Sequence, residues 1–339
     1  MSRRTPLSAD AAKALTLVAL AGAVMLAAIW AVTLGSARTS MGDVVGALIA
    51  FDGSREHLVI MTLRLPRVLA GLLVGAALAV AGAIMQAATH NPLASPGLMG
   101  INAGAAFAVV MVTTLGGATS GMAMVGSAFG GATAAAGIVL LFASAGPAGA
   151  TPLRLVLAGA VLTAFITSLT TAVLIFDQST LDQVRLWSAG SLSGRTQAQV
   201  AGVAPFILAA LGIAILLRAH ITTLSIGSDM ARAVGQDPRV WRGVVAMLVI
   251  GLAGGAVALA GPIGFVGLVV PHLARFGVGV DYRWIIPFSA LAGALLVVLA
   301  DAAGRTLLAS QSFPVGVTMA LIGGPFFVWL ARTRTGGAS

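Results

Sequence analysis

Apolar runs of about twenty residues recur along the whole chain and limit what it can fold into. Each run is long enough to cross a hydrocarbon core of roughly 30 Å as an α-helix. Because lipid offers no partners to backbone groups, closed helices are the expected form. Of the 339 residues, 58% are hydrophobic and 9% are charged, whereas about a quarter of an ordinary soluble domain is charged. The sequence therefore predicts an all-α polytopic membrane protein.

Charges and turn residues divide these runs into about ten spans, which form one transmembrane domain over residues 1–339. The predicted spans are approximately 13–35, 63–86, 97–115, 119–143, 152–176, 196–218, 241–260, 263–277, 284–302 and 313–332. An even number places both termini on one side. With the termini inside, twelve of the 19 Lys and Arg residues lie in inner segments, so both termini are predicted to be cytoplasmic.

Two stretches of the sequence resemble each other and predict an inverted internal repeat. Residues 66–71 read PRVLAG and 75–82 read GAALAVAG, while 238–243 read PRVWRG and 254–261 read GGAVALAG. In the ten-span arrangement these two copies cross the membrane in opposite directions, as is common in transporters. Chance similarity between two spans rich in small residues remains an alternative.

The sequence lacks the usual signatures of catalysis and metal binding. It has no cysteine, no P-loop sequence, and four histidines in separate segments, so we expect no catalytic residue, no metal site and no cofactor on this chain. The net charge of +9 is spread over short loops, which argues against a nucleic-acid partner. Every carboxylate lies in a loop or at a span end. The energy for transport then comes from a partner protein or, as the alternative, from an ion gradient, as in a secondary transporter.

Six segments in order resemble the permease subunits of ABC importers for ferric siderophores, haem and cobalamin, which are type II importers. They are LRLPRVLAGLLVGAALAVAGAIMQ (63–86), THNPLASPGLMGINAGAAFA (89–108), LSIGSDMARAVGQD (224–237), GPIGFVGLVVPHLARF (261–276), DYRWIIPFSALAGALLVVLAD (281–301) and FPVGVTMALIGGPFFVWL (313–330).

The resemblance implies a bacterial inner-membrane subunit that translocates an iron chelate, most often a ferric siderophore, with haem or cobalamin as the other substrates. In such importers two permease subunits, either a homodimer or a pair of close paralogues, enclose the pore within membrane lipid. Two ATP-binding cassette subunits dock from the cytoplasm and carry the ATP and Mg. An external substrate-binding protein delivers the substrate.

The resemblance also assigns roles to three groups of residues. Cytoplasmic coupling helices are expected at 224–240, where a solvated loop is the alternative, and the coupling residues are Leu224, Gly227, Ala231, Arg232 and Gly235. Docking of the binding protein is expected at Arg64, Arg67 and Arg305, although a lone Arg at a span end commonly extends to the membrane interface. A cytoplasmic gate is expected at Asn91, Leu93 and Thr151, where helix breaking by Pro92 and helix capping are the alternatives.

Overall fold

The computed structural model describes residues 9–35, 39–116, 121–145, 151–307 and 313–335, and within these ranges the only regular secondary structure is helical. The helices are α1 (Ala9–Thr33), α2 (Met41–Ile49), α3 (Arg55–Val59), η1 (Ile60–Arg64), α4 (Leu65–Thr89), η2 (Pro96–Met99), α5 (Ile101–Gly116), α6 (Gly121–Ser144), α7 (Pro152–Phe176), α8 (Gln178–Ser188), α9 (Gln197–Leu216), α10 (Arg218–Ile226), α11 (Ser228–Ala233), α12 (Pro238–Val249), η3 (Ile250–Gly254), α13 (Gly255–Ala260), α14 (Val266–Val278), α15 (Tyr282–Leu307) and α16 (Val315–Thr335).

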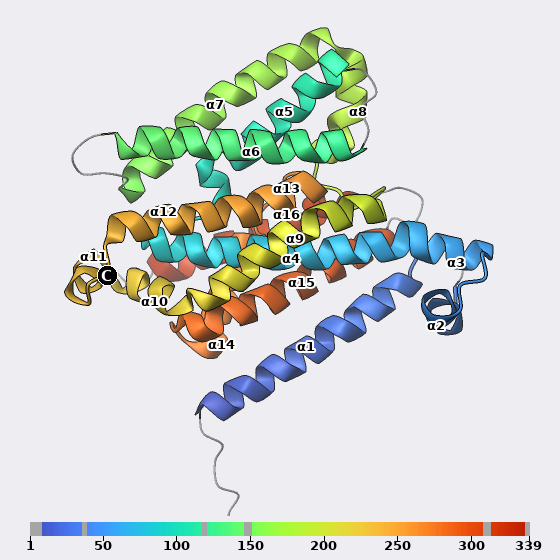
Figure 1. The fold of residues 1–339 in the computed structure, drawn as a ribbon, viewed down its shortest axis with the longest axis horizontal. Coiled ribbons are helices and arrows are strands. Elements are labelled where there is room, and N and C mark those ends of the chain that lie inside the picture. The colour runs from blue at the N-terminus through green and yellow to red at the C-terminus, as the bar shows by residue number, and fades with distance from the viewer. Residues whose placement is uncertain (1–8, 36–38, 117–120, 146–150, 308–312, 336–339) are drawn as a thin grey trace, which may run out of the picture.

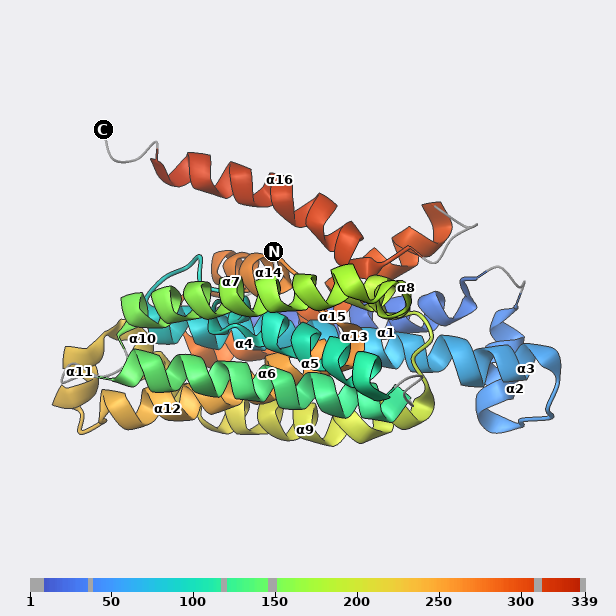
Figure 2. The same cartoon turned by 90° about the horizontal axis from the view of Figure 1, so that it is seen from above.

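Helix α4 forms the centre of the bundle (Figure 1) and contacts α9, α12, α13, α14 and α15. In the continuous helix Arg55–Thr89, 78% of the residues in its most apolar 18-residue stretch are buried, whereas the corresponding share in α1 is 11%. Helices α5, α6 and α7 pack together as a separate layer on one side (Figure 1). Figure 2 shows most of α16 extending away from the other helices. The core therefore surrounds α4, and α1 and α16 lie at the periphery.

Two glycines let neighbouring helices approach the backbone of α4. A Cβ added at Gly82 would lie 1.9 Å from the carbonyl oxygen of Gly267 on α14, and one added at Gly75 would lie 2.2 Å from that of Gly293 on α15. Small residues of this kind are what bring helices together in lipid, where hydrophobic burial provides no drive between them. The sequence of α4 thus sets its contacts with both α14 and α15.

Polar residues at the helix starts explain several of the boundaries. The Thr196 hydroxyl accepts a hydrogen bond from the Gln199 backbone N–H, and the Gln199 side chain accepts one from the Thr196 N–H, which completes a capping box before α9. Asp177 caps α8 in a similar way, and hydrogen bonds from the Thr180 side chain and backbone hold the pKa of this carboxyl well below its ordinary value. Asp177 therefore ends α7 and begins α8, so the two helices are distinct.

Among the described residues, seven helical stretches are long and apolar enough to cross a membrane, and three shorter apolar helices accompany them. The long stretches are Ala9–Thr33, Arg55–Thr89, Gly121–Ser144, Leu153–Phe176, Gln197–Leu216, Pro238–Ala260 and Tyr282–Thr306, and the shorter ones are Ile101–Gly116, Val266–Val278 and Val315–Val328. Each of the ten predicted spans overlaps one of these helices. Residues 119 and 120, at the start of the predicted fourth span, lie outside the described residues, and the count of ten spans stays a prediction.

The short helices gather at two opposite ends of the bundle, named here the α11 end and the α3 end. Helices α10 and α11 lie at the α11 end, together with the start of α1 and the end of α16, whereas α2, α3 and α8 lie at the α3 end (Figures 1 and 2). Helix α4 runs from the α3 end to the α11 end and α12–α13 runs the opposite way (Figure 1). These directions are those that an inverted repeat requires, while the repeat itself remains a prediction.

Candidate functional site

The predicted coupling segment, residues 224–240, covers the end of α10, all of α11 and the first residues of α12. Gly227 joins the helices with φ of 138°, and Gly235 follows α11 with φ of 79°. At Gly235 this conformation is left-handed, which strains any residue that has a Cβ. Arg232 is exposed and forms an ion pair with Asp229 at 3.3 Å, a surface contact of small energetic value. Both glycines therefore determine the backbone path of the segment through their positive φ angles.

The apolar side chains of this segment divide between an inner and an outer face. Leu224 and Ala231, two of the predicted coupling residues, are buried inside the subunit. Ile226, Met230 and Val234 are 63%, 50% and 65% exposed and recur every four residues. Met230 and Val234 lie four residues apart at α11 and its C-cap, so they share one face, whereas Ile226 precedes the break at Gly227. The face of α11 available to a partner is thus the one bearing Met230 and Val234, which the sequence alone did not separate from the buried face.

Specific contacts attach the coupling segment to the central helix. The His90 side-chain Nε2 lies 2.9 Å from the carbonyl oxygen of Leu224, and the Gln236 side-chain amide donates to the carbonyl of His220 at 3.2 Å. The His220 ring also stacks on Trp241 of α12, with 3.9 Å between ring centroids. His90 ends α4 in a left-handed conformation. A displacement of α10 and α11 would therefore act directly on the end of α4.

The predicted gate residues lie at the same end of the bundle. Asn91 follows His90, and its side-chain oxygen accepts a hydrogen bond from the Leu93 backbone N–H at 2.9 Å, while the Leu93 side chain is 41% exposed. The Thr151 hydroxyl accepts a hydrogen bond from the Arg154 backbone N–H at 3.4 Å and caps α7. Asn91 thus fixes a local turn and Thr151 a helix start. Their role in gating stays a prediction.

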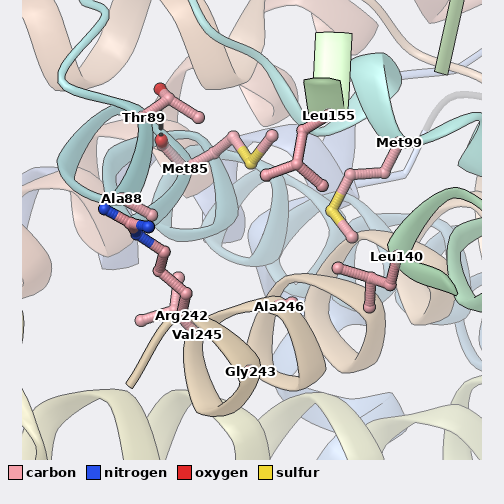
Figure 3. A pocket seen from close by; sticks show the side chains of 10 residues that line it. All are labelled: Met85, Ala88, Thr89, Met99, Leu140, Leu155, Arg242, Gly243, Val245 and Ala246. Atoms are coloured by element: carbon pink, nitrogen blue, oxygen red, sulfur yellow. Dashed lines mark hydrogen bonds between the residues drawn. The ribbon is translucent and has the colours of Figure 1, made fainter. Parts of the chain in front are cut away.

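A small apolar cavity of about 40 Å³ lies between the end of α4 and α12 (Figure 3). Figure 3 shows the side chain of Arg242 reaching from α12 toward Ala88, opposite the sulfur atoms of Met85 and Met99. The lining residues are Met85, Ala88, Thr89, Met99, Leu140, Leu155, Arg242, Gly243, Val245 and Ala246. These residues come from near the ends of α4, α6, α7 and α12, and from Met99 of η2.

The capping role of Thr151 gives a first testable prediction. Thr151→Ala should lower the free energy of unfolding by about 1 kcal/mol, because the Arg154 N–H loses its partner, whereas Thr151→Ser should leave stability close to wild type. Thermal unfolding in detergent measures both variants. If transport falls equally in both variants while only Thr151→Ala loses stability, capping does not account for the importance of Thr151.

At the α3 end, the predicted docking residue Arg67 is bound to a buried carboxylate. Its Nε donates to Asp301 Oδ2 at 2.9 Å and its Nη2 donates to Asp301 Oδ1 at 2.8 Å. The remaining nitrogen, Nη1, donates to the Ser193 hydroxyl at 3.3 Å. Such a two-bond contact with a carboxylate is the strongest arrangement available to a guanidinium. Arg67 on α4 is thereby joined to α15 and to the segment before α9.

The other two predicted docking arginines join the same cluster. Arg305 Nε lies 3.2 Å from Asp301 Oδ2, and its Nη1 donates to two carbonyl oxygens at the end of α1. Arg64 Nη1 donates to two more, at 3.1 and 2.8 Å. The four accepting carbonyls belong to Ala31, Val32, Thr33 and Leu34. Cations at a helix C-terminus are favourable because its last carbonyls lack partners and carry negative charge.

The structure thus brings Arg64, Arg67 and Arg305 together, as expected of one docking surface, but it turns their nitrogen atoms inward. Asp301, which joins Arg67 to Arg305, was missed as a site residue because it lies at the end of a predicted span. The sequence does place Asp301 four residues before Arg305, and this spacing could have indicated that the two side chains pair on one helix. Among the described residues, no three His, Asp or Glu side chains lie close enough together to hold a metal ion.

The sequence matches known proteins over nearly its whole length. Residues 23–333 match the profile of the FecCD transport family. The chain is 45% identical to the "Probable siderophore transport system permease protein YfiZ" of Bacillus subtilis, with 94% of this chain and 96% of that protein covered. It is 42% identical to the "Ferric enterobactin transport system permease protein FepD" of Escherichia coli, with 86% and 88% covered.

A solved structure resembles the fold just described. It is "An inward-facing conformation of a putative metal-chelate type ABC transporter", with a TM-score of 0.82 and 27% sequence identity. The similarity covers 94% of this chain and 99% of that one. The arrangement of helices around α4 is therefore one that a membrane transporter subunit adopts.

Proposed function

Because this chain belongs to the FecCD transport family, we propose that it is the translocation subunit of an ATP-driven importer for an iron chelate, foremost a ferric siderophore. Relatives described as siderophore and ferric enterobactin permeases support the substrate class. Haem and cobalamin are the other substrates of the importers that the sequence resembles. The subunit is non-catalytic, and ATP and Mg bind to its ATPase partner.

The observation that carries this proposal is the attachment of α10 and α11 to the end of α4. An exposed apolar face on Met230 and Val234 offers an ATPase a docking site, and the contact between His90 and Leu224 links that site to the helix at the centre of the subunit. Conformational work done on α10 and α11 would then bias the subunit between two access states.

The proposed assembly has a partner for each end of the bundle. Two copies of this chain, or this chain and a close paralogue, pair in the bacterial inner membrane with both termini in the cytoplasm. Two ATPase subunits bind the α11 ends through residues 224–240. An external substrate-binding protein binds the α3 ends, where Arg64, Arg67 and Arg305 supply positive charge. The gate at Asn91, Leu93 and Thr151 lies on the ATPase side of the pathway.

Uptake into proteoliposomes tests the proposal. Liposomes containing this chain, its ATPase subunit and its binding protein should accumulate a radiolabelled ferric siderophore when ATP is present on the ATPase side. Liposomes that lack the ATPase, or that contain ADP, are the controls and should remain at background. Uptake by this chain alone, driven by an imposed proton or sodium gradient, would instead establish a secondary transporter.

A further inference from the structure

Three guanidinium groups lie together at the α3 end of the bundle, and two of them, those of Arg67 and Arg305, contact the carboxylate of Asp301. Asp301 is almost fully buried, and the side chains of Arg67 and Arg305 are 14% and 11% exposed. Together with Arg64, which is also buried, the cluster carries three positive charges and one negative charge. Such an excess is costly to bury, because each charge loses water. The cluster is therefore electrostatically complementary to a further carboxylate.

The bonds of Arg67 occupy the edge that would suit that carboxylate best. Its Nε and Nη2, the edge suited to two-bond recognition, are both on Asp301, and Nη1 is on Ser193. Arg305 is tied to Asp301 and to carbonyl oxygens at the end of α1. An acidic side chain from outside can reach the two-bond edge of Arg67 only by replacing Asp301 there.

The geometry also shows why that replacement would cost little stability. If Arg67 leaves, Asp301 is not stranded as a lone buried charge, because Arg305 remains at 3.2 Å from Oδ2. Truncating one partner of an isolated buried pair is severely destabilising, but here a second cation stays in place. Arg67 then exchanges one carboxylate for another, and the total number of charge-assisted contacts is preserved.

Release of Arg67 from Asp301 would also disturb the Arg67 to Ser193 hydrogen bond, and Ser193 lies in a segment that contacts other helices. The backbone next to Ser193 is bound on two sides, because the Ser191 N–H donates to the carbonyl of Ala260 at 2.7 Å and the Gly316 N–H donates to the carbonyl of Gly190 at 2.9 Å. The first contact is with the end of α13, and the second is with the start of α16. The Arg67 to Ser193 bond thus connects the arginine cluster to the base of α16.

We propose that Asp301 is a latch whose place on Arg67 is taken by an acidic side chain of the docking partner, and that this exchange signals docking to α16 through Ser193. The inference rests on the proposed function in one respect, namely that an acidic external protein docks at the α3 end. Asp301 in this role is a positioning residue, since it acts through Arg67 and touches no substrate.

The latch itself can be tested without any partner. Phenylglyoxal, which modifies accessible guanidinium groups, should label Arg67 several-fold faster in Asp301→Asn than in wild type, as measured by mass spectrometry. Asp182→Asn is the matched control, because Asp182 forms an exposed pair with Arg185 on α8 and its loss should leave Arg67 labelling unchanged. Unchanged Arg67 labelling in folded Asp301→Asn would overturn the latch, and it would do so whatever the function of the protein.

The exchange is tested by affinity for the binding protein in nanodiscs. If Asp301 competes with the incoming carboxylate, Asp301→Asn should bind the partner roughly fivefold more tightly than wild type, and the gain should shrink at high salt. If Asp301 merely held the arginines in position for the partner, the same change would weaken binding and overturn the exchange. Absence of any binding by wild type would instead remove the proposed function, and the labelling result would stand on its own.

A second variant follows the signal and does not depend on the stability of Asp301→Asn. The chain has no cysteine, so Leu321→Cys on the exposed part of α16 gives a single reporter for maleimide. Addition of the binding protein should change its labelling rate, and Ser193→Ala should abolish that change while binding affinity stays at the wild-type value. A full change in the Ser193→Ala background would overturn the route through Ser193.

Discussion

Replacing Gly82 with valine should prevent the subunit from folding into a stable bundle. The first added carbon would lie 1.9 Å from the carbonyl oxygen of Gly267, far inside van der Waals contact, and backbone on both sides leaves little room for relaxation. The same carbonyl accepts a hydrogen bond from the buried Gln86 side chain at 3.1 Å, which the displacement of α14 would break. Overpacking alone typically costs about 1–3 kcal/mol, and an orphaned buried amide adds about 1–3 kcal/mol.

Size-exclusion chromatography in detergent and thermal unfolding are the measurements. Gly82→Val should aggregate or melt far below wild type. Gly137→Val on α6 is the matched control, because nothing lies within 4 Å of a Cβ at that position. A monodisperse Gly82→Val protein with wild-type thermal stability would show that α4 and α14 do not pack at this distance.

Introducing a carboxylate at Val234 or Met230 should abolish association with the ATPase while leaving the subunit folded. Met230 is 50% exposed and Val234 is 65% exposed, so the change disturbs few internal contacts. In the assembled importer the same carboxylate would be buried without a partner, and loss of a central interface residue costs about 2 kcal/mol or more. Co-purification with the ATPase should therefore fall at least about thirtyfold.

The control for this prediction is Val280→Asp, which places the same charge on an exposed residue outside α10 and α11. Val280→Asp should retain the ATPase. Ala231→Asp, by contrast, should destabilise the subunit itself, because Ala231 is fully buried. If Val234→Asp and Met230→Asp both bind the ATPase as wild type does, the outward face of this segment is not the docking surface.

The long helices could be predicted because their limits are encoded locally. Helix α7 covers residues 152–176, the same range as the predicted span, since Thr151 and Pro152 start it and the polar Asp177 follows it. Helix α15 was predicted to end at residue 302 but continues to Leu307. A charge normally ends an apolar run, but Asp301 and Arg305 are accommodated within this helix because each is paired inside the bundle.

The site residues were harder to place because their surroundings come from distant parts of the chain. Leu224 and Ala231 are of the same residue types as a docking face would use, and only the packing of α10 and α11 against the bundle shows that they are buried. The pairing of Arg67 with Asp301 joins residues 234 positions apart. No local sequence pattern indicates such a contact. The three arginines could therefore be predicted to lie at one end of the protein, but the sharing of Asp301 by Arg67 and Arg305 could not be predicted.

The pairing of α4 with α15 constrains how the protein is made. At roughly 5–20 residues per second, a ribosome needs about 10–40 s to synthesise the roughly 190 residues between the end of α4 and the start of α15. During that time the nascent α4 lies in the membrane without the helix that covers it, and Arg67 lies there without Asp301. The central helix of the finished bundle is therefore among the first to be inserted and among the last to be enclosed, and a chain whose translation stops before α15 cannot complete its core.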